Sequence, residues 1–160
     1  MRLHPSGLLR DSRNLELLRL LGEDPRIGIA ELARRIGMSG PAVRERMLRL
    51  EEAGVIAGYT LQLDAAALGY AVCAYVRVRP APGQLPKVAA LAKRTPEVVE
   101  CHRVTGEDCL VLKVYLPSLE RLDEVIDRFL AHGQTTTSIV QSTPVPLRAL
   151  PLPAAPEGGS

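Results

Sequence analysis

Five arginines lie close together between residues 34 and 49, where the only acidic residue is Glu45. Arginine guanidinium groups bind phosphate, and they also donate paired hydrogen bonds to guanine. The five are Arg34, Arg35, Arg44, Arg46 and Arg49. The whole chain of 160 residues has a formal charge of only +2. The positive charge is therefore local, and a local patch is what attracts a polyanion.

A short turn divides this basic segment into two predicted helices. Gly37 suits the end of the first helix, because glycine adopts a positive φ without strain. Ser39 can cap the second helix, and Pro41 fits its first turn. The apolar residues of the second helix are spaced to share one face: Val43, Met47 and Leu50. The pattern predicts a helix-turn-helix at about residues 29–48.

The opposite face of the second helix is the candidate contact surface for DNA. Arg44 lies in the half of the helix that enters a major groove, so it is the best candidate for a base contact. Ser39 suits a phosphate, while Arg46 lies at the edge of the buried face and has a structural or phosphate role. The predicted DNA-binding residues are Arg34, Arg35, Ser39, Gly40, Pro41, Arg44, Glu45, Leu48 and Arg49. The alternative is an ordinary solvated helix face.

A second group of polar residues could bind an amino acid. The carboxylates of Glu107 and Asp108, which follow the turn glycine Gly106, could accept hydrogen bonds from an α-amino group. Hydroxyl and amide groups suitable for a carboxylate come from four consecutive residues: Gln134, Thr135, Thr136 and Thr137. The alternative is a polar β-turn and an edge strand.

Other chemistry is not indicated. The three cysteines form no CxxC pair, and Cys101 and His102 are adjacent in a predicted strand, so they point to opposite faces. No nucleophile and base, metal cluster or glycine-rich phosphate loop is present, so we predict no catalytic or metal site, no cofactor and no enzyme. Because neither a signal peptide nor a membrane-spanning run is evident, a cytoplasmic location is expected.

The elements around these residues predict two domains of an α+β protein. Three helices, the first capped by Asp11, make a DNA-binding domain of residues 1–54, and an alternating linker strand follows at 55–69. Residues 70–143 then predict the order strand, helix, strand, strand, helix, strand, with the second helix capped by Ser118 and ended by Gly133. This βαββαβ order is ferredoxin-like. Residues 144–160 contain five prolines and predict an extended or disordered tail.

Helices cover only one face of such a sheet. The other face would partly expose a mixed group of side chains: Cys73, Tyr75, Cys109, Val111 and Tyr115. An uncovered apolar face favours association, so we expect two copies of this sheet to pair.

Residues 9–148 resemble the Lrp/AsnC family of feast/famine regulators. The resemblance rests on Ser39, Val43, Arg46, Leu50, Glu51, Gly54, Ile56, Gly58, Tyr59 and Gly69. It implies a winged-helix-like DNA-binding domain and an amino-acid effector bound near subunit interfaces. It also implies homodimers that assemble further, to tetramers or octamers. The chain departs from the family pattern at three positions: Gly28 replaces a Ser or Thr cap, Asn14 an Asp, and Cys109 the Asp of a Gly-x-x-Asp turn.

The sequence therefore predicts a regulator that binds double-stranded DNA and responds to an amino acid or similar effector. One alternative is a DNA-binding regulator or architectural protein without such an effector. Two others are an enzyme on the ferredoxin-like domain and a module that binds proteins through its helices.

Overall fold

The computed structural model describes residues 5–154, which form two compact units. The first unit contains residues up to Leu61 together with the segment from Leu147, and the second spans Gln62–Pro146. The ends of the predicted N-terminal domain and tail, residues 1–4 and 155–160, lie outside the described part. None of the described helices combines the length and apolar composition needed to cross a membrane.

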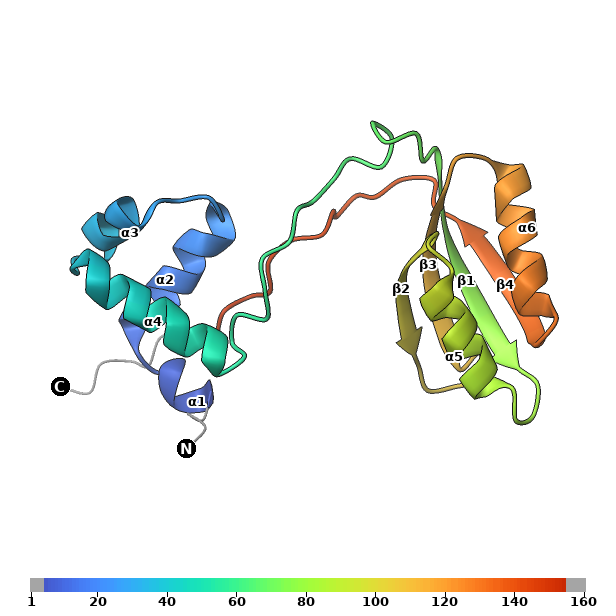
Figure 1. Cartoon of the computed structure of the whole chain (residues 1–160), viewed down its shortest axis with the longest axis horizontal. Coiled ribbons are helices and arrows are strands. Elements are labelled where there is room, and N and C mark those ends of the chain that lie inside the picture. Colours follow the sequence, from blue (N-terminus) through green and yellow to red (C-terminus); the bar gives the residue numbers. More distant parts are fainter. Residues whose placement is uncertain (1–4, 155–160) are drawn as a thin grey trace. The chain divides into compact units, whose positions relative to one another are not determined.

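The first unit is helical, with α1 (Pro5–Leu8), α2 (Ser12–Glu23), α3 (Ile29–Ile36) and α4 (Gly40–Glu52) (Figure 1). As predicted, the Asp11 side chain caps α2 by accepting the N–H of Arg13 at 2.9 Å. The core joins α2, α3 and α4 through Leu17, Leu20, Leu21, Leu32, Ala33, Val43 and Leu50. Removing these side chains from water stabilises the unit, at roughly 25 cal/mol per Å² of apolar surface buried.

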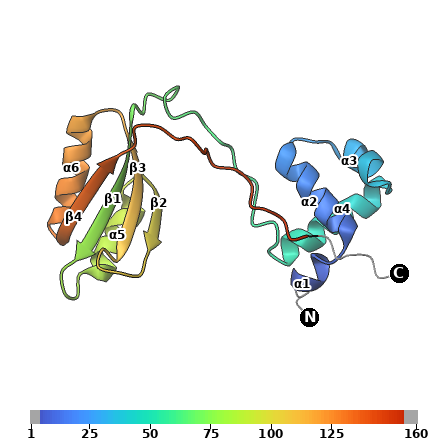
Figure 2. The ribbon, with the colours of Figure 1, turned by 180° about the vertical axis from the view of Figure 1, so that it is seen from behind.

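The second unit has the predicted ferredoxin-like order. Its elements are β1 (Val72–Pro80), α5 (Leu85–Arg94), β2 (Val98–Arg103), β3 (Leu110–Leu116), α6 (Leu119–Leu130) and β4 (Gly133–Ile139). The strands form one antiparallel sheet in the order β2-β3-β1-β4. Figure 1 shows α5 in front of the sheet, and Figure 2 shows the opposite side.

The core of the second unit lies between the sheet and both helices. Alternate residues of β1 and β3 face it, and α5 and α6 contribute Val88, Ala92, Leu122, Val125 and Phe129. The burial of β3 alternates strictly along its seven residues, as the sequence pattern predicts for a sheet with one covered face. Each unit therefore has a core of its own.

The prediction of a linker strand at residues 55–69 is wrong. No strand forms between α4 and β1, and Leu61 and Leu63 are exposed, at 80% and 60%. The segment 55–63 alternates like a strand, but none of the described strands pairs with it. Alternation alone does not make a strand, because its backbone groups also need a partner.

Gly133 also has a different role from the predicted one. Helix α6 ends three residues earlier, at Leu130, and Gly133 begins β4 opposite Pro80. A Cβ atom at position 133 would collide with the carbonyl oxygen of Arg79. Glycine is therefore required by the close approach of β4 to β1 rather than by a helix end.

Candidate DNA-binding surface and effector site

The turn before α4 has the geometry that its residues predict. Gly37 ends α3 in the left-handed region, at φ 70°. The Ser39 hydroxyl accepts the N–H of Ala42 at 3.4 Å, and Pro41 lies in the first turn of α4. Val43 and Leu50 are fully buried beneath the helix, with Met47 packed beside them. These contacts fix which face of α4 points outward.

The outward face of α4 carries five of the nine predicted DNA-binding residues. Pro41, Arg44, Glu45, Leu48 and Arg49 are exposed, and Leu48 is a large apolar side chain with 53% of its surface accessible. Arg44 forms neither a hydrogen bond nor an ion pair with any side chain that the structure describes. Its guanidinium group can therefore be offered to another molecule without breaking a contact first.

Three other predicted arginines have acidic neighbours on their own helices. Arg34 and Arg35 bind Glu31 at 2.6 and 2.7 Å, and Arg49 binds Glu45. Hydrogen bonds from Arg34 and then Arg35 lower the pKa of Glu31 to about 2. These pairs are exposed to solvent, where an ion pair is weak and a phosphate can compete for the arginine.

Arg46 has a structural role, one of the two alternatives that the sequence left open. Its Nη1 donates to Asp11 at 2.5 Å and to the Oδ1 of Asn14 at 2.7 Å, which ties α4 to the start of α2. Asn14 is 3% exposed and donates in turn to the carbonyl oxygen of Leu8 at 2.9 Å. Burial raises the pKa of Asp11, but hydrogen bonds from Arg46 and the N–H of Arg13 outweigh it, so the pKa lies below its usual value.

Sequence reasoning missed this network because its members are 32 and 35 residues apart. One signal was available: Asn14 falls on the apolar face of α2, at helical spacing from Leu17, Leu18 and Leu21. A buried amide requires hydrogen-bond partners, so a polar residue in that position predicts a network of some kind.

The two predicted effector segments meet at β1. Arg79 forms an ion pair with Glu107, and the Nε of Arg77 lies 3.7 Å from Asp108. Both arginines belong to the uncovered face, because they alternate along β1 with Val76 and Val78, which face the core. On the other side, Arg77 is opposite Thr136 and Arg79 is opposite Gln134. Carboxylates, guanidinium groups, a hydroxyl and an amide thus share one corner of the open face.

The residues of β4 divide between the two faces. Directly paired residues of antiparallel strands point to the same side, so Gln134 and Thr136 lie with the arginines. Thr137 is paired with the buried Val76, and Thr135 shares its side, so both lie on the helix-covered face. Sequence reasoning also missed Arg77 and Arg79, although their spacing in an alternating strand placed both on one face.

The rest of the open face is partly apolar, as expected. Tyr75 is 41% exposed, and Cys73, Val111 and Tyr115 are half-buried. Lys113 lies on β3 with Tyr115 and is paired with Tyr75 of β1: its Nζ is 5.7 Å from the ring centre of Tyr115 and 3.1 Å from Oε1 of Glu100. The two central strands of this face therefore carry both apolar and charged side chains.

The cysteines and histidines form no metal site within residues 5–154. Cys101 is paired with the buried Leu112, and His102 with Val111 on the open face, so the two side chains point apart as predicted. Burial raises the pKa of the Cys101 thiol.

Comparison with known proteins identifies both units. Residues 10–57 match the family described as winged helix-turn-helix DNA-binding, and residues 73–150 match the Lrp/AsnC ligand binding domain. An uncharacterised HTH-type transcriptional regulator YezC of Bacillus subtilis is 35% identical over 83% of this chain and 94% of its own. The regulator LrpA of Mycobacterium tuberculosis is also 35% identical, over 79% of this chain and 87% of its own.

Solved structures support the same identification. Bacillus subtilis LrpC superimposes with a TM-score of 0.79 at 31% identity, over 83% of this chain and 95% of that one. A feast or famine regulatory protein of M. tuberculosis complexed with L-methionine gives 0.82 at 32% identity, over 89% and 99%. The chain therefore belongs to the Lrp/AsnC family. It is a DNA-binding transcriptional regulator with a helix-turn-helix unit and a ferredoxin-like unit, and its relatives are regulators rather than enzymes.

Proposed function

We propose that α4 is the recognition helix and that Arg44 contacts the base edges of the operator. The observation that carries this proposal is the difference between the arginines: Arg44 alone among the five has no partner in residues 5–154. Arg34, Arg35 and Arg49 bind the flanking phosphates by exchanging their exposed carboxylate partners. Ser39, Gly40 and the free N–H groups at the start of α4 suit a phosphate as well, while Pro41, Glu45 and Leu48 line the contact surface.

Selection of bound sequences from random DNA supplies the operator for the test. Replacing Arg44 with Ala should weaken binding to that operator by about 1–3 kcal/mol and relax the base preference at one position. Arg49→Ala is the matched control. It should weaken binding to all DNA sequences similarly, and it should reduce the slope of log affinity against log salt concentration by about 1, as expected for the loss of one phosphate contact. Unchanged operator affinity in the Arg44→Ala protein would contradict the role of Arg44.

We propose that the effector is an α-amino acid bound at the corner formed by Gly106, Glu107, Asp108, Gln134 and Thr136, with Arg77 and Arg79 beside them. Guanidinium groups can hold the α-carboxylate, and the carboxylates can accept from the α-ammonium group. Thr135 and Thr137 then support β4 from the covered face. Two similar solved structures, from M. tuberculosis and Neisseria meningitidis, are complexes with L-methionine, which makes L-methionine the first compound to test.

Calorimetry with L-methionine, its N-acetyl derivative and its methyl ester separates the two charges of the ligand. Each derivative removes one charged end, so each should bind at least tenfold more weakly than the free amino acid. Arg77→Gln should abolish the difference between the acid and the ester. If none of the twenty amino acids produces heat, an amino-acid effector is excluded, but the DNA-binding role is not affected.

We propose that the chain acts in the cytoplasm as a homodimer, which can assemble further to a tetramer or octamer. Pairing through the open face would bury its apolar side chains, among them Tyr75 and Tyr115. Sedimentation at micromolar concentration should show a species larger than 17.3 kDa, and Tyr75→Glu should dissociate it. A two-fold pair would place its recognition helices about 34 Å apart, or a multiple of this distance. A 17.3 kDa species alone would exclude the dimer.

A further inference from the structure

Residues 147–154 associate with the helical unit although they form no helix or strand. The segment 147–154 contains three leucines, and their exposure shows where the segment is in contact with other residues. Leu147 and Leu150 are 79% and 86% exposed, whereas Leu152 is only 39% exposed. The tail is therefore not uniformly solvated, and Leu152 is the residue that distinguishes it from a free extended chain.

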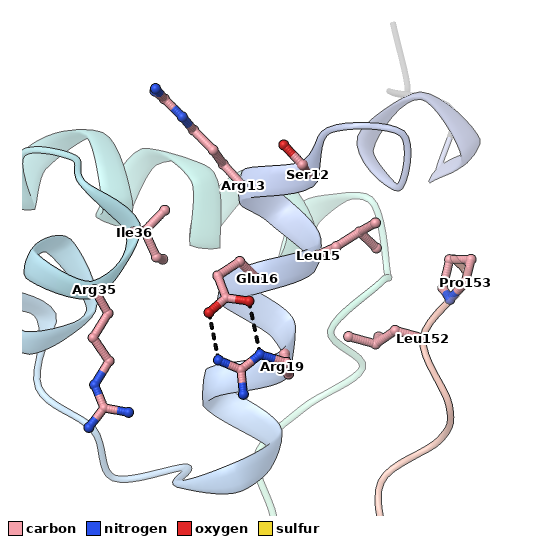
Figure 3. A pocket seen from close by; sticks show the side chains of 9 residues that line it. All are labelled: Ser12, Arg13, Leu15, Glu16, Arg19, Arg35, Ile36, Leu152 and Pro153. Atoms are coloured by element: carbon pink, nitrogen blue, oxygen red, sulfur yellow. Dashed lines mark hydrogen bonds and ion pairs between the residues drawn. The ribbon is translucent and has the colours of Figure 1, made fainter. Parts of the chain in front are cut away.

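The surface next to Leu152 belongs to α2. Leu152 and Pro153 form one wall of a hollow of about 570 Å³, whose other walls are Ser12, Arg13, Leu15, Glu16, Arg19, Arg35 and Ile36. Figure 3 shows Leu15 extending from α2 toward the tail. A Cβ atom at Gly22, near the end of α2, would lie 3.6 Å from the Cβ of Ala149, so the tail also follows the far end of that helix.

The burial of Leu15 is independent evidence that the tail contacts α2. It is 7% exposed, yet it is absent from the core that joins α2, α3 and α4. A leucine that faces away from the core of its own unit needs another apolar neighbour to stay out of water. The apolar residues across the hollow are Leu152 and Pro153.

We propose that residues 147–154 are an intramolecular strap that docks on α2, with Leu152 and Pro153 placed against Leu15. Prolines favour this role because an extended Pro-rich segment loses little conformational freedom when it docks. Docking of the strap gives the helices of the first unit a second, non-covalent link to residues 62–146, besides the covalent one at residue 61. A change in the second unit can then act on the helical unit through both connections.

The strap also approaches the DNA-binding surface. Arg35, one of the proposed phosphate contacts, lines the same hollow. The docking itself does not depend on the proposed function, and it can be measured without DNA.

Hydrogen exchange of the full-length protein tests the strap. Leu152→Asp should speed exchange in residues 12–20 several-fold and leave the strands of the second unit unchanged. Leu150→Asp is the matched control, since it adds the same charge two residues away on an exposed side chain, and it should have no effect. A chain ending at Pro146 should reproduce the effect of Leu152→Asp. If exchange in α2 is the same in all these proteins, the strap does not exist.

A crosslinking experiment tests whether the tail that lies against α2 belongs to the same chain or to a second copy. A photoreactive residue in place of Pro153 should link to residues 12–19 in a mixture of light and isotopically heavy chains refolded together. Links within one isotope support an intramolecular strap. Links that join light and heavy chains in statistical proportion would instead assign the position against α2 to the tail of a second copy, and would overturn the proposal as stated.

Discussion

The proposed recognition helix α4 and the proposed effector corner are built in different ways. The geometry of α4 is set by neighbours in the sequence: Gly37, Ser39, Pro41 and the spacing of Val43 and Leu50. The effector corner is assembled by strand pairing, which brings Asp108 and Thr136 to the two sides of Arg77. A local motif can be identified from spacing, whereas a site formed by β1, β4 and the loop between β2 and β3 depends on the register of the sheet.

The largest effects are expected in the two cores. Replacing Phe129 with Ala should destabilise the second unit by about 3–5 kcal/mol, because a large buried ring leaves a cavity. Leu50→Ala should cost the helical unit about 2–5 kcal/mol for the same reason. Since the two cores share no residue, each substitution should lower only one of two transitions in calorimetry. Leu119→Ala, at a position that is 53% exposed, is the control on α6 and should change little.

Gly133 tests the strand pairing on which the effector corner depends. Gly133→Ala should destabilise the second unit by about 1–3 kcal/mol, since the added Cβ collides with the backbone at Arg79. Gly7→Ala is the control, because nothing lies within 4 Å of the added atom. Chemical denaturation followed by circular dichroism measures both. Equal stability of the two variants would mean that β4 can shift away from β1.

Arg46 and Arg44 are two residues apart on α4, and they should behave oppositely. Arg46→Ala should lower the stability of the helical unit by about 1–3 kcal/mol, because it removes the donor to Oδ2 of Asp11 and leaves Oδ1 of the buried Asn14 without a donor. Arg44→Ala should leave stability within about 0.5 kcal/mol of the original, as expected for an exposed site, and weaken only DNA binding. Thermal unfolding and gel shifts on both proteins distinguish structural from contact arginines.

The smallest effect concerns Glu31. Its pKa is lowered from 4.5 to about 2 by Arg34 and Arg35. The ion pair therefore stabilises the folded state above pH 4.5, and this contribution is lost as the pH falls from 4.5 through about 2. Glu31→Gln should flatten the pH dependence of stability in that window.

At neutral pH the same substitution frees both arginines for phosphate. Glu31→Gln should slightly increase DNA affinity and steepen its salt dependence, as titrations between 50 and 200 mM salt would measure. Unchanged salt dependence would mean that neither arginine contacts DNA.

The sequence by itself determined the order of elements in the second unit, the caps of α2, α4 and α6, and the outward face of α4. All of these depend on residues within one or two turns of each other, where spacing fixes geometry. It could not determine that the segment 55–63 lacks a partner strand, that Gly133 lies against β1, or that Arg46 holds Asp11 and Asn14. Nor could it reveal that Leu152 lies beside α2. These features depend on which distant segments meet, and that is decided only when both cores pack and the strands pair.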